Sequence, residues 1–101
     1  MLLSDLEEKE IRKYIFQYDF SMYLNNKTIL ITGAKGIIGS GMIKWILYAN
    51  KMFNLNCRIV ASSRSSQRPE YIDNSDPIVY CNIGEERKTL EGKVDYIIHT
   101  A

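Results

Sequence analysis

The sequence predicts an α/β fold in which a leading amphipathic helix precedes a parallel sheet of four strands in the order 3-2-1-4. Three observations predict it. Residues 28–32 form a continuous β-branched and apolar run, which is typical of a strand buried on both faces in a parallel sheet. A glycine-containing segment and a stretch of helical periodicity follow this run, and three further short apolar runs come later. Right-handed crossovers between such strands produce the order 3-2-1-4.

Length and composition limit the classes of protein to consider. The 101 residues allow one small domain, and 46% hydrophobic with 25% charged residues is typical of globular proteins. A formal charge of +1 without a one-signed basic stripe argues against nucleic-acid binding. We see no secretion signal and no run of about 20 apolar residues for a membrane span. Two distant cysteines favour neither a zinc site nor a disulfide framework, so we expect reduced thiols and a cytoplasmic location.

The leading helix is predicted to begin after Ser4, because Ser4 and Glu7 fit a capping box. Its apolar positions recur at helical spacing on one face: Ile11, Tyr14, Ile15 and Tyr18. This face packs either on its own domain or on a partner subunit, and the sequence leaves both open. We therefore divide the chain into residues 1–26, the helix and a turn at Asn25-Asn26, and residues 27–101, which contain the sheet.

The remaining elements follow in order. The first strand is residues 28–32, and a second helix runs from residue 38 to the 50–56 region. The second helix places these apolar residues at helical spacing: Ile38, Met42, Trp45, Ile46, Ala49 and Phe53. The other strands are predicted at residues 57–61, 77–81 and 94–99. Residues 62–76 are predicted as a loop with at most one helical turn, and the charged residues 85–88 as a solvated connection.

The segment from Gly33 to Gly39 leaves a buried strand and opens a helix, which is the context of a dinucleotide site. Gly33 permits a sharp turn, Gly36 lets the backbone approach a pyrophosphate, and Gly39 lets the helix lie close to the sheet. The amides of the first helical turn form an anion site, to which Lys35 either adds or turns away into water. No Gly-Lys-Ser/Thr sequence follows, so a nucleoside-triphosphate P-loop is disfavoured.

Two segments resemble a known family. Residues 32–39, Thr-Gly-Ala-Lys-Gly-Ile-Ile-Gly, resemble the T-G-x-x-G-x-x-G fingerprint of the short-chain dehydrogenase/reductase superfamily. Residues 94–101, Val-Asp-Tyr-Ile-Ile-His-Thr-Ala, resemble the D-x-(V/I)-(I/V)-H-x-A strand of its extended branch, which contains nucleotide-sugar epimerases, dehydratases and decarboxylases. The resemblance runs from about Lys27 to the last residue. It implies the N-terminal portion of a Rossmann-type, NAD- or NADP-binding domain.

The resemblance also implies roles for individual residues. The three glycines would line the pyrophosphate, and Ile37 and Ile38 would provide the first helical amides. Thr100 and Ala101 would back the ribose and nicotinamide half of the cofactor. His99 is interpreted as a structural residue at the end of its strand.

The end of the second strand departs from the NAD-specific pattern. Ser63 and Arg64 stand where an acidic residue would bind the adenosine ribose. Arg64, with Arg68, could pair with a 2′-phosphate, so NAD and NADP both stay open. After the third strand, Asn82-Ile83 stands where the family places an aspartate and an apolar residue near adenine. An asparagine can still hydrogen-bond the base.

The catalytic Tyr-x-x-x-Lys pair of the family would follow a fifth strand, which these residues do not reach. Tyr23 and Lys27 have the right spacing but precede the first strand, and we interpret them as coincidence. We expect the chain to be an incomplete, four-stranded piece that binds the cofactor but is inactive alone, with nucleotide sugar bound only by a full-length parent. The alternative is a non-catalytic nucleotide sensor or assembly module. A sheet so thinly covered also predicts self-association into a homo-oligomer.

Overall fold

The computed structural model describes residues 1–17, 21–64, 67–81 and 93–100. Within these ranges the elements are α1 (Asp5–Gln17), α2 (Ser21–Leu24), β1 (Thr28–Thr32), α3 (Ile37–Phe53), β2 (Arg58–Ser62), β3 (Ile78–Cys81) and β4 (Tyr96–His99). The four strands form one parallel sheet in the order β3-β2-β1-β4. The predicted α/β fold class, the strand order and the leading helix are therefore confirmed.

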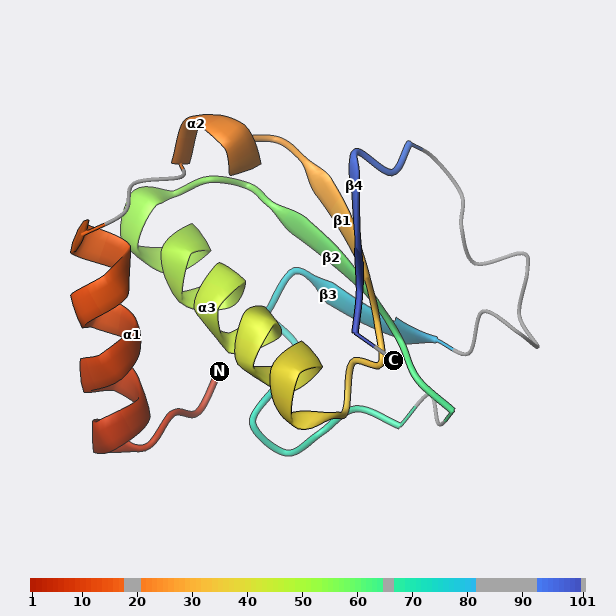
Figure 1. Ribbon diagram of the computed structural model, residues 1–101, viewed down its shortest axis with the longest axis horizontal. Helices are drawn as coiled ribbons and strands as arrows, with labels where there is room; N and C mark the ends of the chain where they lie inside the picture. Colours follow the sequence, from red (N-terminus) through yellow and green to blue (C-terminus); the bar gives the residue numbers. More distant parts are fainter. Residues whose placement is uncertain (18–20, 65–66, 82–92, 101) are drawn as a thin grey trace.

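The helices gather on one side of the sheet, as Figure 1 shows: α3 lies across one face, and α1 packs beside α3. Lys44 of α3 pairs with Glu7 of α1, and the Tyr48 hydroxyl lies 3.5 Å from a carboxylate oxygen of Glu8. The carboxyl ends of the strands meet at the edge where α3 begins, at the lower right of the view. This edge is where the glycine segment lies.

The hydrophobic core lies mainly between α3 and the sheet. Its fully buried members include Ile29 and Ile31 of β1 and Ile59 of β2, which alternate with residues on the opposite face. On that opposite face Leu30 and Val60 are also buried, in a smaller cluster with Cys81. Since β1 and β2 are buried on both faces, the apolar run at residues 28–32 is confirmed as an interior parallel strand.

The capping box at the start of α1 is confirmed. The Glu7 amide donates to the Ser4 hydroxyl oxygen at 3.1 Å, and the Ser4 amide donates to the Glu7 carboxylate at 3.2 Å. The bond from Lys44, with that from Ser4, lowers the pKa of Glu7. Ile15 is buried as expected, but Tyr14 is 49% exposed, which corrects its predicted place on the buried face. Adjacent helical residues point about 100° apart, so a face centred on Ile15 leaves Tyr14 toward solvent.

The second strand begins one residue later than predicted, at Arg58. The side chain of Asn50 explains this, because it accepts the Cys57 amide and donates to the Cys57 carbonyl, both at 2.7 Å. These bonds take the backbone groups that a strand residue would offer to its neighbour. Burial raises the pKa of the Cys57 thiol to about 11.

The third and fourth strands are shorter than predicted, at residues 78–81 and 96–99. Pro77 lacks an amide for strand pairing. Asp95 uses its carboxylate to accept the Thr28 amide at 2.9 Å, which fixes the start of β4 beside β1. The short helix α2 was not predicted, and the described part of residues 62–76 contains turns after β2 but no helix. Tyr18 and the predicted connection at residues 85–88 lie outside the described residues.

Candidate functional site at the carboxyl edge of the sheet

The glycine segment lies at the switch point of the sheet, where the chain changes direction. Strand β1 has β2 on one side and β4 on the other. After β1 the chain continues to β2 on one side of β1, and after β3 it continues to β4 on the other side. In open parallel sheets of this kind, the crevice outside the carboxyl ends at the switch point is the usual ligand site. Gly33 follows β1 directly at this position.

Gly33 makes the turn that leads the chain from β1 into α3. Its φ of 61° lies in the left-handed region, which residues other than glycine rarely adopt. Its carbonyl accepts the Gly36 amide at 3.0 Å, and the Ala34 amide donates to the Ser62 carbonyl at 3.0 Å. The turn is thus tied to the end of β2 as well as closed on itself.

Gly39 brings the first turn of α3 against this bend. A Cβ atom at Gly39 would lie 2.3 Å from the Gly33 carbonyl oxygen and 3.0 Å from the Ala34 Cα atom. Both neighbours are backbone atoms and have no flexible side chain to move away. The close approach of helix and turn therefore requires glycine at this position.

Gly36 differs from the other two glycines. It is the N-cap of α3, with φ −72° and ψ 171°, a conformation open to any residue. A Cβ atom here would come no closer than 3.4 Å, to the Gly33 carbonyl oxygen. The fold of the described residues therefore does not require glycine at this exposed position. The space left by the absent side chain faces away from the turn and is open to a ligand.

The start of α3 offers backbone amides to this edge. Gly36 has no side chain that could cap the helix, and the amides of Ile37, Ile38 and Gly39 have no acceptor within an α-helix. The first helical bond runs from the Ser40 amide to the Gly36 carbonyl at 2.9 Å. Such an uncapped N-terminus favours a bound anion.

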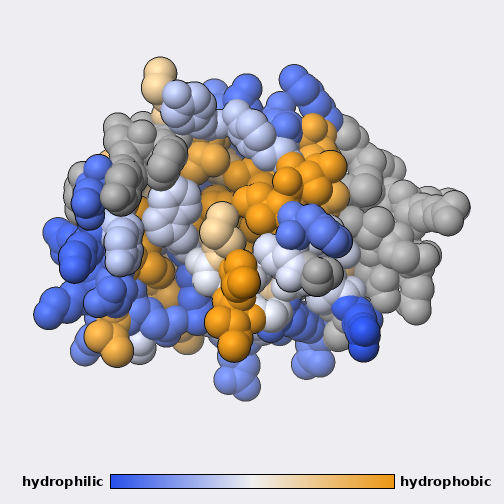
Figure 2. Space-filling model, viewed as in Figure 1, coloured by the Kyte–Doolittle hydropathy of each residue, from blue (hydrophilic) through white to orange (hydrophobic). Residues whose placement is uncertain are grey.

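The two isoleucines that provide the first of these amides carry exposed apolar side chains. Ile37 is 93% exposed and Ile38 is 69% exposed, and Figure 2 shows hydrophobic side chains at the surface where α3 begins and along β4. The prediction that Ile38 lies on the packed face of this helix is therefore wrong: in the first turn of α3 only Gly39 is buried, and the helix buries apolar side chains from Ile43 onward.

A hydrogen-bond network that sequence reasoning missed joins β4 to this turn. The Thr32 hydroxyl oxygen lies 2.6 Å from Nδ1 of His99 and accepts the Thr100 amide at 3.2 Å. The Thr100 hydroxyl donates to the Thr32 carbonyl and lies 3.3 Å from the Gly33 carbonyl oxygen. Thr32 and His99 are register partners at strand ends that the sequence did predict, so pairing these two ends side by side would have brought the three polar side chains together. Ala101 lies outside the described residues.

The ends of β2 and β3 form the other side of the edge. The Ser63 amide donates to the Cys81 carbonyl at 3.1 Å, which continues the pairing of β2 with β3 by one residue. Ser63 is half-buried and Arg64 is exposed. Asn82 and Ile83, which we expected near adenine, lie outside the described residues.

A groove of about 390 Å³ begins beside the glycine segment. Its lining combines Lys35 of the turn and Ser40 of α3 with the loop that follows β2: Gln67, Arg68, Pro69, Glu70 and Tyr71. Arg68 donates to the Asn74 side chain at 2.5 Å. The sequence places Lys35 and Arg68 far apart, and the fold brings them to the same groove.

Near this groove the rings of two tyrosines, Tyr80 and Tyr71, lie under the ammonium groups of Lys35 and Lys44. The hydroxyls of Tyr71 and Tyr80 lie 3.3 Å apart, and the Lys35 ammonium lies 5.9 Å from the centre of the Tyr80 ring. The Lys44 ammonium lies 4.8 Å from the centre of the Tyr71 ring. Burial and the bond to Tyr71 raise the pKa of Tyr80, so its hydroxyl carries no negative charge near neutral pH.

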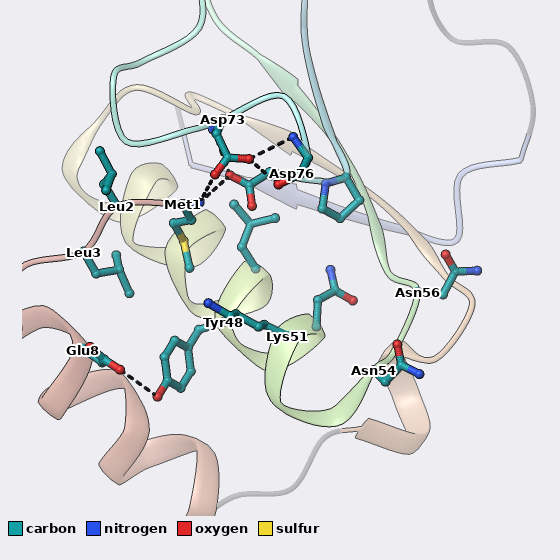
Figure 3. A pocket seen from close by; sticks show the side chains of 14 residues that line it. Met1, Leu2, Leu3, Glu8, Tyr48, Lys51, Asn54, Asn56, Asp73 and Asp76 are labelled. Atoms are coloured by element: carbon teal, nitrogen blue, oxygen red, sulfur yellow. Dashed lines mark hydrogen bonds and ion pairs between the residues drawn. The ribbon is translucent and has the colours of Figure 1, made fainter.

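A larger cavity, of about 600 Å³, lies at the opposite, amino edge of the sheet. Figure 3 shows that the Met1 amine is held there by two carboxylates, Asp73 at 2.6 Å and Asp76 at 3.1 Å. The bond to Asp73 raises the pKa of this amine, and the amine in turn lowers the pKa of Asp73. Because these groups already satisfy one another and the glycine segment is remote, we place the candidate site at the carboxyl edge.

Other kinds of site are not found in the described part of the chain. It contains no group of three or more His, Cys, Asp or Glu side chains that could hold a metal ion. Cys57 and Cys81 are buried free thiols. No helix of the described ranges is long and apolar enough to span a bilayer.

Comparison of the chain with models of protein families, with curated proteins and with solved structures finds no match. The case for a function therefore depends on the geometry of the carboxyl edge.

Proposed function

We propose that this chain binds a nicotinamide dinucleotide, NAD or NADP, with its pyrophosphate over the first turn of α3. One observation carries the proposal: an uncapped helix N-terminus, preceded by a glycine turn, lies at the switch point of a parallel sheet. Backbone amides at such a position bind diphosphate oxygens without needing a basic side chain.

Gly36 supports the same reading. The turn tolerates a Cβ atom at Gly36 but not at Gly39, although both belong to one glycine motif. The fold does not need glycine at position 36, beside the proposed anion site. A ligand that has to approach the Gly36 backbone would explain why a residue without a side chain stands there. The exposed side chains of Ile37 and Ile38 would then lie against the apolar parts of that ligand instead of against water.

The remaining site residues follow from this placement. Ser63 and Arg64 follow β2 at the same edge and would face the adenosine ribose. Thr100 would back the cofactor through its contacts with Thr32 and Gly33. Contacts of Asn82, Ile83 and Ala101 with the cofactor stay predictions, since these residues lie outside the described ranges.

We further propose that the chain is the cofactor-binding portion of a nucleotide-sugar epimerase, dehydratase or decarboxylase-like enzyme and does not transfer hydride alone. A catalytic tyrosine and lysine four residues apart act from one helix face. Tyr23 belongs to the four-residue helix α2, whereas Lys27 follows the turn after it, so this pair is not presented on one helix. Turnover of a nucleotide sugar by the chain alone would contradict this part of the proposal.

Calorimetric titration of the folded protein with NAD and with NADP tests the binding proposal. We expect at least one of them to bind, and Gly36→Val to weaken binding by about tenfold or more, because its side chain occupies the approach to the amides. Gly41→Val is the matched control: Gly41 lies on α3 with open space around it. Circular dichroism verifies that each variant is folded. Absence of binding by folded wild-type protein would refute the proposal.

A further inference from the structure

We infer that the N-terminal segment, residues 1–7, holds the loop of residues 67–76 in place beside the dinucleotide site, with Glu7 and Lys44 as positioning residues for the adenosine half of the ligand. The inference rests on the proposed function, because it takes the pyrophosphate to bind at the start of α3. It goes beyond that function, since neither Glu7 nor Lys44 lines the groove beside the glycine segment. Both act through Tyr71, which does line it.

The loop lies where it can affect a ligand at the carboxyl edge. Its residues 67–71 form one side of the groove, and Lys35 and Ser40, which flank the first amides of α3, form the other. In open parallel sheets of this kind the adenosine ribose lies at the end of the second strand, and this loop follows β2 in the chain. The position of the loop therefore determines how closely the groove fits the adenosine half.

The first two residues of the chain hold the loop directly. The Leu2 amide donates to the Tyr71 carbonyl at 2.8 Å. The Met1 amine contacts the carboxylates of Asp73 and Asp76, as Figure 3 shows. Asp76 is itself fixed within the loop, because its carboxylate accepts the Asp73 amide at 3.0 Å. These contacts join segments that are 72 residues apart in the chain.

Lys44 of α3 connects the same loop to α1. Its ammonium pairs with the Glu7 carboxylate and lies 4.8 Å from the centre of the Tyr71 ring. The attraction between a cation and an aromatic face grows where water is excluded, and only 22% of the Lys44 side chain is exposed. The contact with Lys44 lowers the pKa of Glu7, so Glu7 is charged near neutral pH and keeps the ammonium in place.

Further contacts run from Tyr71 to the glycine turn. The Tyr71 hydroxyl lies 3.3 Å from the Tyr80 hydroxyl, and the Tyr80 ring centre lies 5.9 Å from the Lys35 ammonium. Lys35 belongs to the turn before α3, whereas Tyr80 belongs to β3. A change at Glu7 or Lys44 can therefore reach both sides of the groove without touching the ligand.

Calorimetry with two probes separates the loop from the start of α3. Inorganic pyrophosphate tests the amides alone, whereas adenosine diphosphate adds the adenosine half that would lie beside the loop. We expect Lys44→Gln and Glu7→Gln each to weaken binding of adenosine diphosphate about fivefold, because a ligand that must order the loop itself loses affinity. Pyrophosphate binding should change by less than about twofold. The double variant should lose no more than Lys44→Gln alone, since both changes remove one contact.

The choice of variants isolates this contact from the stability of the fold. A glutamine side chain still completes the capping box with Ser4, so Glu7→Gln removes only the charge. Lys44→Arg keeps a cation for the ring and should bind adenosine diphosphate within about twofold of wild type. Glu10→Gln on α1 and Lys51→Gln on α3 change exposed residues away from the loop contact and are the matched controls. Circular dichroism verifies that each variant is folded.

The outcomes separate the two proposals. A selective loss of affinity for adenosine diphosphate in Lys44→Gln and Glu7→Gln, restored in Lys44→Arg, supports the inference. If the folded variants bind both probes as wild type does, or if both probes weaken by the same factor, the positioning role is refuted. The proposed function still stands in that case, because it depends on the binding of NAD or NADP by wild type. If Lys44→Arg binds as weakly as Lys44→Gln, the role of the charge is refuted as well. If folded wild-type protein binds neither NAD nor NADP, both proposals fail.

Discussion

Replacement of Gly39 by alanine tests whether the close approach of α3 to the glycine turn is as tight as the structure indicates. The new Cβ atom would lie 2.3 Å from the Gly33 carbonyl oxygen, about 1 Å inside the 3.4 Å at which ordinary contact begins. Forced overlap in a packed region costs about 1 to 3 kcal/mol. The helix propensity of alanine returns at most about 1 kcal/mol relative to glycine. Taking this return in full, we expect Gly39→Ala to lower the free energy of unfolding by up to about 2 kcal/mol.

Gly41→Ala is the matched control, because it makes the same change two residues later in α3, where a Cβ atom has nothing within 4 Å. Here only helix propensity acts, and the free energy of unfolding should rise by about 0.5 to 1 kcal/mol. Urea denaturation, followed by far-UV circular dichroism and the fluorescence of Trp45, measures both changes. Equal stability of the two variants would show that the turn moves aside at no cost and would refute the argument for Gly39.

Two further predictions concern the ends of strands. Asn50→Ala should lower the free energy of unfolding by about 2 to 3 kcal/mol, because the Cys57 amide and carbonyl each lose a hydrogen bond at 2.7 Å. Urea denaturation measures this change, and unchanged stability would contradict the prediction. Asp95→Asn should remove a pH-dependent part of the stability. The Thr28 amide, and then Lys93, lower the pKa of Asp95, so its contribution is present above about pH 4 and is lost as pH falls through the lowered pKa. Thermal unfolding of wild type and variant should therefore differ at pH 6 and converge at low pH, and a constant difference would refute the assignment.

Self-association stays a prediction. The structure shows apolar side chains exposed along β4, with Ile97 at 68% and Tyr96 at 40%, at the end of the strand order. Such an edge is a common place for chains to pair. A single monomeric species at every concentration in sedimentation would argue against it.

The fold class could be predicted from the sequence because local signals agreed with one another. The apolar run at residues 28–32 is continuous and not alternating, which predicts a strand buried on both faces. A glycine segment and then a stretch of helical periodicity follow it directly. The capping box at Ser4 and Glu7 is also local, since both residues belong to one helical turn. Signals of this kind do not depend on the rest of the fold.

What the sequence by itself determined about this protein is therefore the order of its four strands and two longer helices, the glycine turn between β1 and α3, and the last residues of β1, β3 and β4. Only the tertiary structure decided that the fold has room for a Cβ atom at Gly36 but not at Gly39. It alone decided that Ile38 is exposed and that Lys35 and Arg68 line one groove. It also decided that Thr32 and Thr100 tie β4 to the turn, across 68 residues of chain. The physical reason is that contacts across such distances in the chain depend on how strands and helices are placed together, which spacing along a single segment does not encode.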